Sequence, residues 1–521
     1  MKKIILALSI LSITLYAQNI KYSFSQEFES IKKHVDFGFY KFGKNKYAEV
    51  YFKAEKDMMF QIYDENFNSI KNEETTLLPE IDSKHVAHES FFSVKNDYYW
   101  FYSTWDRKTE TERLFAQPFN QGVFKFTENP INLIETSRLI PYDKYKFSTS
   151  TDSTKLLVTY KVKPKIKNDK LNKDIVGFNL YDNKMKKIYA AEIEMPYSEF
   201  DMDNLLYKVD SRGNIYMLTQ VKINNALDGE KSKENKKAYR YELIRVNQKE
   251  NILQSIKIEL INKYTNSVVL TEDLNHNIVV TGYYSNLKNS GGADGAYLAK
   301  LELNENNSVK KFNISYYEFP TEILKAYETT RTKKKMDKKN KDDNLEAWNL
   351  KFDRVVFEKD GGMLIIGEEN YDVTYSYRCG NSTCYSTTYY SEDIYVLKID
   401  NAGRTQWCRK IPKQQSTGYN SISHHFHPYN GEYYFFYLDN IKNLDLSLTE
   451  SPAWFNGGKG SYLTCVKIDA NGKMIKKSIF DPREEEVHIY PRNFETISAN
   501  VIVDRLREDR KHSKVFRLEL K

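Results

Sequence analysis

Three histidines stand close together in the sequence, at His424, His425 and His427. Side chains alternate between the two faces of a strand, so His425 and His427 would share one face and His424 would point away. Imidazole nitrogens bind zinc, and two of them could hold a metal if a carboxylate or His488 came near. The spacing supplies no third ligand. We therefore expect no metal centre; His425 and His427 are the candidate ligands, with a structural or channel-facing role as the alternative.

Neighbouring carboxyl groups such as those of Glu368 and Glu369 could act as acid and base in glycoside hydrolysis. That reaction needs two carboxyl groups at a set separation across a cleft, which the sequence does not define. The chain has no Gly-x-Ser-x-Gly nucleophile motif and no His-Glu-x-x-His zinc motif. Asp273 begins a stretch like a calcium loop, but Ile278 replaces the required glycine and Tyr284 the closing glutamate. We expect no catalytic residue and no cofactor, and an enzyme is the less favoured alternative.

All four cysteines lie in the C-terminal part of the chain, at Cys379, Cys384, Cys408 and Cys465. Cys379 and Cys384 flank a short polar loop, and such close spacing in an exported chain favours a local disulfide. The other two occupy similar strands of neighbouring repeats, where they either pair or stay buried as thiols. Zinc sites with four thiolates usually draw on Cys-x-x-Cys pairs, so a disulfide is favoured over a metal.

The first residues have the pattern of a secretion signal. Two lysines precede the apolar stretch Ile4–Leu15, and Ala17 offers a cleavage site before a polar residue. The apolar stretch is too short to span a bilayer, and no later segment is long and apolar enough to do so. We therefore expect residues 1–17 to be a signal peptide and the mature chain to be exported, periplasmic or extracellular, without a transmembrane segment.

The composition favours a folded protein rich in strands. Hydrophobic residues make up 40% of the chain and aromatic residues 14%, which is enough to bury a core. There are 40 tyrosines and 29 phenylalanines, and these side chains suit the pleated, half-exposed surface of a sheet. The formal net charge of +7 is small for so long a chain and does not favour a nucleic-acid partner.

A hairpin pattern recurs along most of the sequence. In its clearest copy, Ile394–Arg404 alternates apolar and polar residues before a turn, and Thr405–Ile411 leads out of that turn. A second copy runs from Tyr462–Asp469 through a turn into Lys473–Phe480. The units recur about every 60 residues, which suits a four-stranded propeller blade with generous loops.

The two ends of the chain decide between an open array and a closed ring. The last unit offers only three strands, at Phe494–Ile497, Asn500–Leu506 and Lys514–Leu520. The segment Ile20–Phe28 has the pattern of a strand and belongs to no unit after it. On the outer edge of the last blade it would complete that sheet and remove exposed edges. The sequence thus predicts one all-β domain over residues 18–521, a β-propeller of about eight four-stranded blades, or alternatively seven, closed by the N-terminal strand.

The turns Asp210–Gly213, Asp400–Gly403 and Asp469–Gly472 share the order Asp-x-x-Gly. These Asp/Asn-x-x-Gly hairpin repeats resemble those of secreted bacterial β-propellers, particularly of the Bacteroidota type, and the resemblance covers most of the mature chain. It implies the propeller fold and leaves the activity open, because such propellers serve as binding modules, scaffolds and a few enzymes. The regular Gly-His and Trp-Asp signatures of the WD40 branch are absent.

A charged insertion at residues 325–348 separates the fifth and sixth units. Its run Arg331–Lys341 contains six lysines. This composition predicts a solvated helical or mobile excursion. The alternative is a contact for an anionic partner such as lipid head groups or an acidic glycan.

Together these features favour a non-catalytic, exported binding or scaffold protein of the cell envelope. Loops on one face of the ring would recognise its partner, an envelope protein or a polysaccharide. The alternatives are a glycan-active enzyme with acidic residues at the central channel and a structural component of an export or surface machine. We expect a monomer.

Overall fold

The computed structural model describes most of the chain after its first 19 residues. The described residues are 20–31, 35–42, 46–54, 57–77, 86–137, 139, 144–164, 166–223, 238–265, 267–288, 290–341, 345–380, 382–418, 422–457, 460–508 and 511–521. The signal peptide predicted at residues 1–17 lies outside them.

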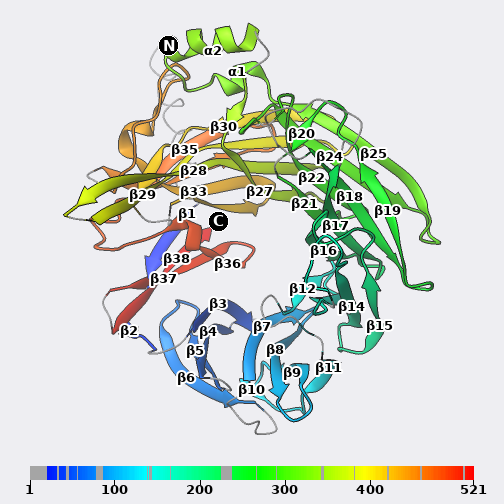
Figure 1. Cartoon of the computed structure of the whole chain (residues 1–521). Helices are drawn as coiled ribbons and strands as arrows, with labels where there is room; N and C mark the ends of the chain where they lie inside the picture. The colour runs from blue at the N-terminus through cyan, green and yellow to red at the C-terminus, as the bar shows by residue number, and fades with distance from the viewer. Residues whose placement is uncertain are drawn as a thin grey trace, which may run out of the picture.

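The described residues form eight antiparallel sheets of four or five strands, which follow one another around a central space (Figure 1). The prediction of an all-β β-propeller is confirmed. The first strands of neighbouring sheets contact one another, as in the pairs β12 with β16, β16 with β21 and β3 with β36. These first strands therefore line the centre of the ring, and the later strands of each sheet lie farther out.

The first four sheets use consecutive strands. The first sheet comprises β3 (Val35–Phe42), β4 (Lys46–Ala54), β5 (Asp57–Tyr63) and β6 (Ser69–Thr76). The second comprises β7 (Val86–Val94), β8 (Asp97–Asp106), β9 (Thr111–Asn120), β10 (Lys125–Phe126) and β11 (Ile131–Thr136). The third comprises β12 (Lys146–Thr149), β13 (Lys155–Lys161), β14 (Ile175–Asp182) and β15 (Lys187–Glu194). The fourth comprises β16 (Met202–Val209), β17 (Ile215–Ile223), β18 (Ala238–Asn247) and β19 (Ile252–Ile258).

The other four sheets carry the insertions and the chain end. The fifth comprises β20 (Tyr264–Thr265), β21 (Val269–Glu272), β22 (Ile278–Ser285), β24 (Gly295–Leu303) and β25 (Val309–Glu318). The sixth comprises β27 (Leu350–Phe357), β28 (Met363–Cys379), β29 (Ser382–Ile399), β30 (Thr405–Ile411) and β31 (Gln415–Thr417). The seventh comprises β32 (His424–Tyr429), β33 (Glu432–Asn440), β34 (Ser461–Ile468) and β35 (Met474–Phe480). The eighth comprises β36 (Glu495–Ser498), β37 (Val501–Arg507), β38 (His512–Leu520), β1 (Ile20–Phe24) and β2 (Phe28–Glu29).

Shorter elements lie in the connections between strands. They are the two-stranded ribbon of β23 (Gly292–Ala293) and β26 (Ala347–Trp348), the helices α1 (Thr321–Leu324) and α2 (Thr330–Lys341), and the 3₁₀ turns η3 (Ile441–Asn443) and η4 (Pro491–Asn493). Helix α2 occupies the charged insertion predicted at residues 325–348. No helix among the described residues is long and apolar enough to cross a membrane.

The Asp-x-x-Gly turns share one hydrogen-bonding pattern, shown by the turn between β29 and β30. The Gly403 N–H donates to the carbonyl of Asp400 at 3.0 Å, and the Arg404 N–H donates to the Asp400 carboxylate at 2.8 Å. Gly403 has a φ of 78°, a conformation that residues with a Cβ rarely adopt. The turn residues therefore fix the reversal that the flanking strands require.

A hydrophobic cluster lies between each pair of neighbouring sheets, eight clusters in all among the described residues. At the junction of the eighth and first sheets, Val503 and Val515 pack with Phe39 and Tyr63. Fully burying one large apolar side chain stabilises a fold by about 1.5–3 kcal/mol. Neighbouring sheets are therefore packed together at every junction, including the one between the eighth sheet and the first.

The N-terminal strand predicted at Ile20–Phe28 is observed as β1 and β2. Strand β1 pairs antiparallel with β38, from Ile20 opposite Leu520 to Phe24 opposite Phe516, and β2 pairs farther along the same strand. The eighth sheet is thus built from both ends of the described chain.

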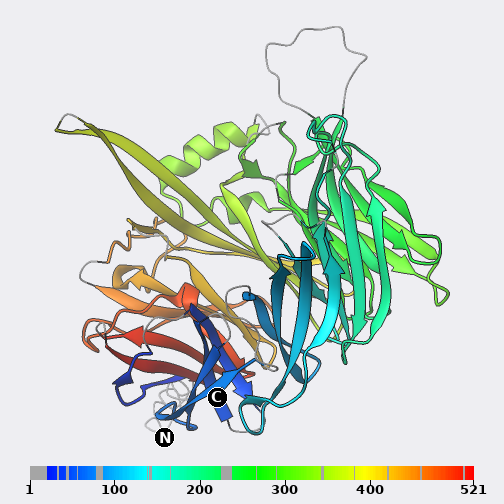
Figure 2. The same ribbon diagram turned by 60° about the horizontal axis from the view of Figure 1, so that its bottom comes forward.

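The sixth sheet departs from the predicted pattern because β28 and β29 are 17 and 18 residues long. A repeat of about 60 residues leads one to expect strands of ordinary length. Instead the two strands continue beyond the sheet as a twisted hairpin that projects from the ring (Figure 2). We call residues 370–391 of this hairpin the arm. A disulfide joins Cys379 and Cys384 at its tip, as predicted, whereas Cys408 and Cys465 are buried free thiols.

Candidate functional site

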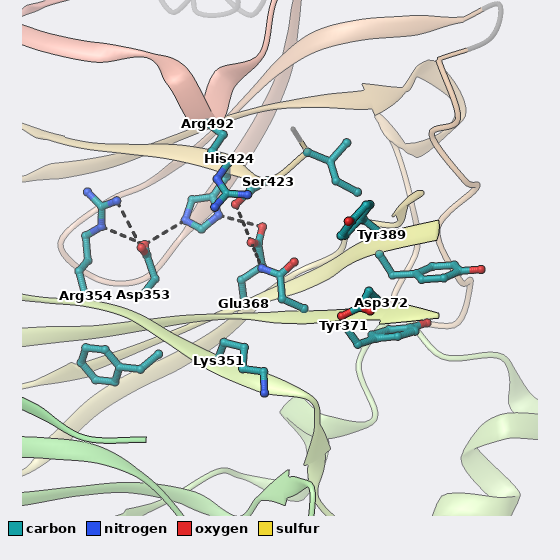
Figure 3. Close-up of a pocket in the computed structure, with 14 residues that line it drawn as sticks. Lys351, Asp353, Arg354, Glu368, Tyr371, Asp372, Tyr389, Ser423, His424 and Arg492 are labelled. Carbon is teal, nitrogen blue, oxygen red and sulfur yellow. Dashed lines mark hydrogen bonds and ion pairs between the residues drawn. The ribbon is translucent and has the colours of Figure 1, made fainter. Parts of the chain in front are cut away.

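A pocket of about 490 Å³ opens where the first strands of the sixth and seventh sheets meet the base of the arm (Figure 3). We call it the central pocket. Its walls come from β27, β28 and β29, from residues 422–424 at the start of β32, and from Arg492 in η4. The pocket therefore gathers side chains from the sixth and seventh sheets and from the turn η4, across more than a hundred residues of sequence.

The floor of the central pocket is built around the buried carboxylate of Glu368. One of its oxygens lies 2.9 Å from Lys413 Nζ and 3.0 Å from His424 Nδ1. The other accepts hydrogen bonds from the Ser423 hydroxyl at 2.6 Å and from the Asn370 amide at 2.5 Å. Burial acts to raise the pKa of Glu368, but the charges of Lys413 and His424 outweigh it and hold the pKa below the ordinary value. Glu368 is therefore ionised and fully engaged.

The imidazole of His424 bridges two carboxylates. Its Nε2 lies 3.3 Å from Asp353, whose carboxylate also accepts from the Arg354 guanidinium at 2.9 Å. Burial works against the charged form, yet the Glu368 charge and the contacts with Asp353 raise the pKa of His424. Asp353 is the extra residue where the pairing of β27 with β28 shifts between Phe352 and Arg354. Such a bulge re-aims a side chain, and here it brings the Asp353 carboxylate to the histidine.

Ser423, His424 and Glu368 have the residue types of a nucleophilic triad but not its connections. The Ser423 hydroxyl donates to Glu368, and the two ring nitrogens of His424 face two carboxylates. A base that activates a serine needs a free ring nitrogen directed at the hydroxyl. The arrangement instead fixes a set of charges and hydrogen-bonding groups in place.

Tyrosines from the base of the arm form the opposite wall of the central pocket, as Figure 3 shows for Tyr371 and Tyr389. Tyr371 and Tyr390 face each other across the two strands, with ring centroids 4.7 Å apart and planes only 7° from parallel. Trp454 adds an edge contact to Tyr390 at 5.8 Å. The Tyr371 hydroxyl donates to Glu392 at 2.7 Å, which fixes the orientation of its ring. The pocket thus combines a charged floor with an aromatic wall.

Glu368 and Glu369, the neighbouring carboxyl pair of the sequence, do not face one cleft. Glu369 does not line the central pocket, and it lies instead near Asp393, Lys410 and Tyr395. Burial and the charge of Asp393 raise the pKa of Glu369 well above its ordinary value. The surroundings therefore shift the pKa values of the two adjacent glutamates in opposite directions, and the two side chains do not share one pocket.

His425 and His427 share a face, as the strand pattern predicts. Both contact the Thr496 hydroxyl at 3.2 Å, and His427 Nε2 also lies 2.7 Å from the Ala499 carbonyl. Burial, followed by the Arg354 charge, lowers the pKa of His425 to about 3. These two histidines join the seventh sheet to the eighth, and no group of three or more His, Cys, Asp or Glu side chains placed to hold a metal occurs among the described residues.

A second cavity, of about 670 Å³, lies at the junction of the eighth and first sheets. We call it the seam cavity. Glu49 there binds Arg505 at 3.2 Å, and Glu495 accepts a hydrogen bond from the Phe39 N–H at 2.8 Å. Burial, aided by the charge of Glu495, raises the pKa of Asp504 to about 8. This cavity therefore holds a carboxyl group that keeps its proton at neutral pH.

The sequence patterns missed most of the central pocket. They placed His424 on the face away from the candidate ligands and gave no role to Asp353, Ser423 or Lys413. One available signal was the alternation of tyrosines on both sides of the cysteine pair, which indicates two long strands joined at a tip. No sequence pattern indicates the contacts of Glu368 with His424 and Lys413, because these contacts join distant parts of the chain.

No protein-family model and no curated protein matches the chain. Solved structures with a similar fold include an uncharacterized protein from Listeria monocytogenes EGD-e, with 10% sequence identity, coverage of 77% of this chain and 85% of that one, and a TM-score of 0.35. The β-propeller domain of the Trilobed protease from Pyrococcus furiosus shares 10% identity over 87% of this chain and 97% of that one, with a TM-score of 0.32. Prolyl oligopeptidase B from Galerina marginata shares 7% identity over 96% of this chain but only 55% of its own length, with a TM-score of 0.37. These are likenesses of fold alone.

Proposed function

We propose that the protein is a non-catalytic, exported binding protein of the cell envelope that holds a segment of polysaccharide in the central pocket. The observation that carries this proposal is the pairing of an aromatic wall, made by Tyr371, Tyr389 and Tyr390, with a fixed polar floor around Glu368. The N-terminal signal pattern and the disulfide at the arm tip support an exported location.

A sugar ring suits both sides of this pocket. Its C–H face is apolar and can lie against an aromatic ring, while its hydroxyl groups project sideways as donors and acceptors. Planar polar groups at the pocket, such as the Arg354 guanidinium and the Asn370 amide, can meet two neighbouring hydroxyls together. The groups of the floor are already fixed by contacts with one another. Ligand binding therefore costs little additional side-chain entropy.

The same contacts favour binding over catalysis. The charges of Glu368, His424 and Asp353 are engaged with one another, and the Ser423 hydroxyl is bound to a carboxylate that is not its base. A group that must take up a proton or attack a substrate needs a free position toward the reacting atom.

Calorimetric titration against a panel of envelope polysaccharides, together with an assay for newly formed reducing ends, tests the proposal. We expect one class of polysaccharide to bind without cleavage, and Tyr390→Ala to weaken that binding about tenfold through loss of stacking. The matched control is Tyr385→Ala, which removes a tyrosine of the same hairpin that is 71% exposed and lies outside the pocket. Release of reducing ends, or equal losses in both variants, would overturn the proposal.

A glycan-active enzyme is the second candidate, and the seam cavity favours it. Asp504 holds a proton near neutral pH and shares the cavity with the carboxyl group of Glu495. Glycoside hydrolysis uses a protonated carboxyl group as the general acid and a second carboxyl group as the base or nucleophile. Release of reducing ends that Asp504→Asn abolishes, while polysaccharide binding persists, would establish this function.

A further inference from the structure

Helix α2 carries four cations on one face. Arg331, Lys334, Lys335 and Lys338 follow the spacing i, i+3, i+4, i+7, which places side chains along one side of a helix. All four residues are exposed. Seven residues of a helix rise about 10 Å, so the four charges form a short line. We call these four residues the basic stripe.

The opposite face of α2 is fixed to the body of the protein. Met336 packs against the hydrophobic cluster shared by the fifth and sixth sheets. Lys333 Nζ donates to the Leu448 carbonyl at 2.8 Å, and Asp337 binds Lys325 at 2.6 Å. These contacts hold the helix in one orientation, so the basic stripe faces away from the protein.

Among the described residues, no carboxylate is paired with the basic stripe. Asp337 is the single acidic residue of α2, and its carboxylate is bound to Lys325 rather than to the stripe. No ion pair joins any of the four side chains to a carboxylate within the described ranges. Four exposed cations held at fixed positions on a helix are a complement for an anionic surface.

The position of α2 decides which kind of anionic partner fits. The helix stands at the top edge of the ring in Figure 1, and its inner face packs on the fifth and sixth sheets. A polysaccharide chain is held best in a concave site such as the central pocket. Exposed charges in a line along one face of a helix can instead all meet a flat surface together. The stripe also lacks apolar side chains, so such contact would be electrostatic, without insertion into the hydrocarbon.

We propose that the basic stripe of α2 docks the protein onto an anionic lipid surface. Each Lys or Arg near an anionic membrane strengthens binding about fivefold, and the attraction falls off within a Debye length. The four cations together therefore give reversible binding that rising salt concentration weakens. This role is independent of the ligand of the central pocket.

Co-sedimentation of the full chain with lipid vesicles tests the proposal. We expect binding to vesicles of equal parts phosphatidylcholine and phosphatidylglycerol, no binding to phosphatidylcholine alone, and release at high salt. Replacing all four stripe residues by glutamine should weaken binding by more than about a hundredfold, from about fivefold for each charge. The substitutions lie on the solvent face, so circular dichroism and the unfolding midpoint should stay unchanged.

The matched control removes the same net charge elsewhere. Glutamine substitutions at Lys108, Lys249, Lys359 and Lys442, which are exposed residues of four different regions, should leave vesicle binding within about fivefold of the original. Equal losses in the two quadruple variants would show a general charge effect and overturn the proposal. A second result would also overturn the proposal: the original protein does not bind anionic vesicles, and the stripe variant loses affinity for an acidic polysaccharide.

Discussion

The central pocket and the seam cavity both place buried carboxyl groups at the centre of the ring, yet those groups differ in their protonation. In the central pocket, Lys413 and His424 lie against Glu368 and keep it ionised. In the seam cavity, the Arg505 cation is bound to Glu49, and burial beside Glu495 leaves Asp504 protonated. The comparison teaches that burial alone does not set the state of a carboxyl group. The cations close to Glu368 outweigh its burial, whereas the charge of Glu495 adds to the effect of burial on Asp504.

The largest expected effect comes from removing the cation of the central pocket. Lys413→Met leaves the Glu368 charge buried with only His424 as its cationic neighbour, and breaking a buried ion pair costs about 3–5 kcal/mol. Denaturant unfolding at neutral pH measures the loss. Lys473→Met, the same substitution at an exposed lysine, should change stability by less than about 0.5 kcal/mol. If the two variants were equally stable, the claim that Lys413 holds Glu368 ionised would be wrong.

The seam cavity should show the opposite behaviour, a stability that falls as pH rises. The pKa of Asp504 is raised to about 8 in the folded state. Between the ordinary aspartate pKa and pH 8, Asp504 therefore keeps its proton in the folded state and loses it in the unfolded state. Between pH 6 and pH 8 this group alone should lower the unfolding free energy by about 2 kcal/mol. Asp504→Asn should remove that slope, as measured by thermal unfolding across this range. Parallel profiles of the variant and the original would contradict the assignment of the proton to Asp504.

A smaller effect distinguishes the histidines of the seventh sheet from one another. The raised pKa of His424 means that its contribution to stability is full below about pH 6.5 and is lost as pH rises through the raised value. His424→Gln should therefore cost about 1 kcal/mol more at pH 6 than at pH 9. His425 has a lowered pKa, so the sign reverses and His425→Gln should gain relative stability as the pH falls below 6.5. Unfolding midpoints of both variants over this pH range give the test, and trends of the same sign would refute it.

Much of the fold follows from local patterns. The strand predicted at Thr405–Ile411 matches β30 residue for residue, and the strand predicted at Lys473–Phe480 begins one residue before β35. The arm was not predicted, because a repeat of about 60 residues leads one to expect strands of ordinary length. The N-terminal strand could be placed because the last unit lacked a fourth strand and no other sheet did.

The candidate site is less visible in the sequence because distant contacts and a bulge create it. Asp353 reaches His424 only because β27 has a one-residue bulge at that point. No local sequence pattern predicts this bulge. The alternation of side chains separated His424 correctly from His425 and His427. The sequence does not indicate which of the two faces lines the central pocket. That depends on the positions of Glu368 and Lys413 relative to β32, which are seen only in the folded chain.

The shared eighth sheet has a consequence for how the protein reaches its folded state. Strand β1 emerges from the ribosome long before β38, the strand with which it pairs. Pairing across so long a stretch of chain is slow, because the connecting loop loses much conformational freedom on closure. Until that pairing forms, the early strand lacks the partner that it has in the folded protein. Proteolytic removal of β1 from the folded protein would expose the edge of β38 and favour association between molecules.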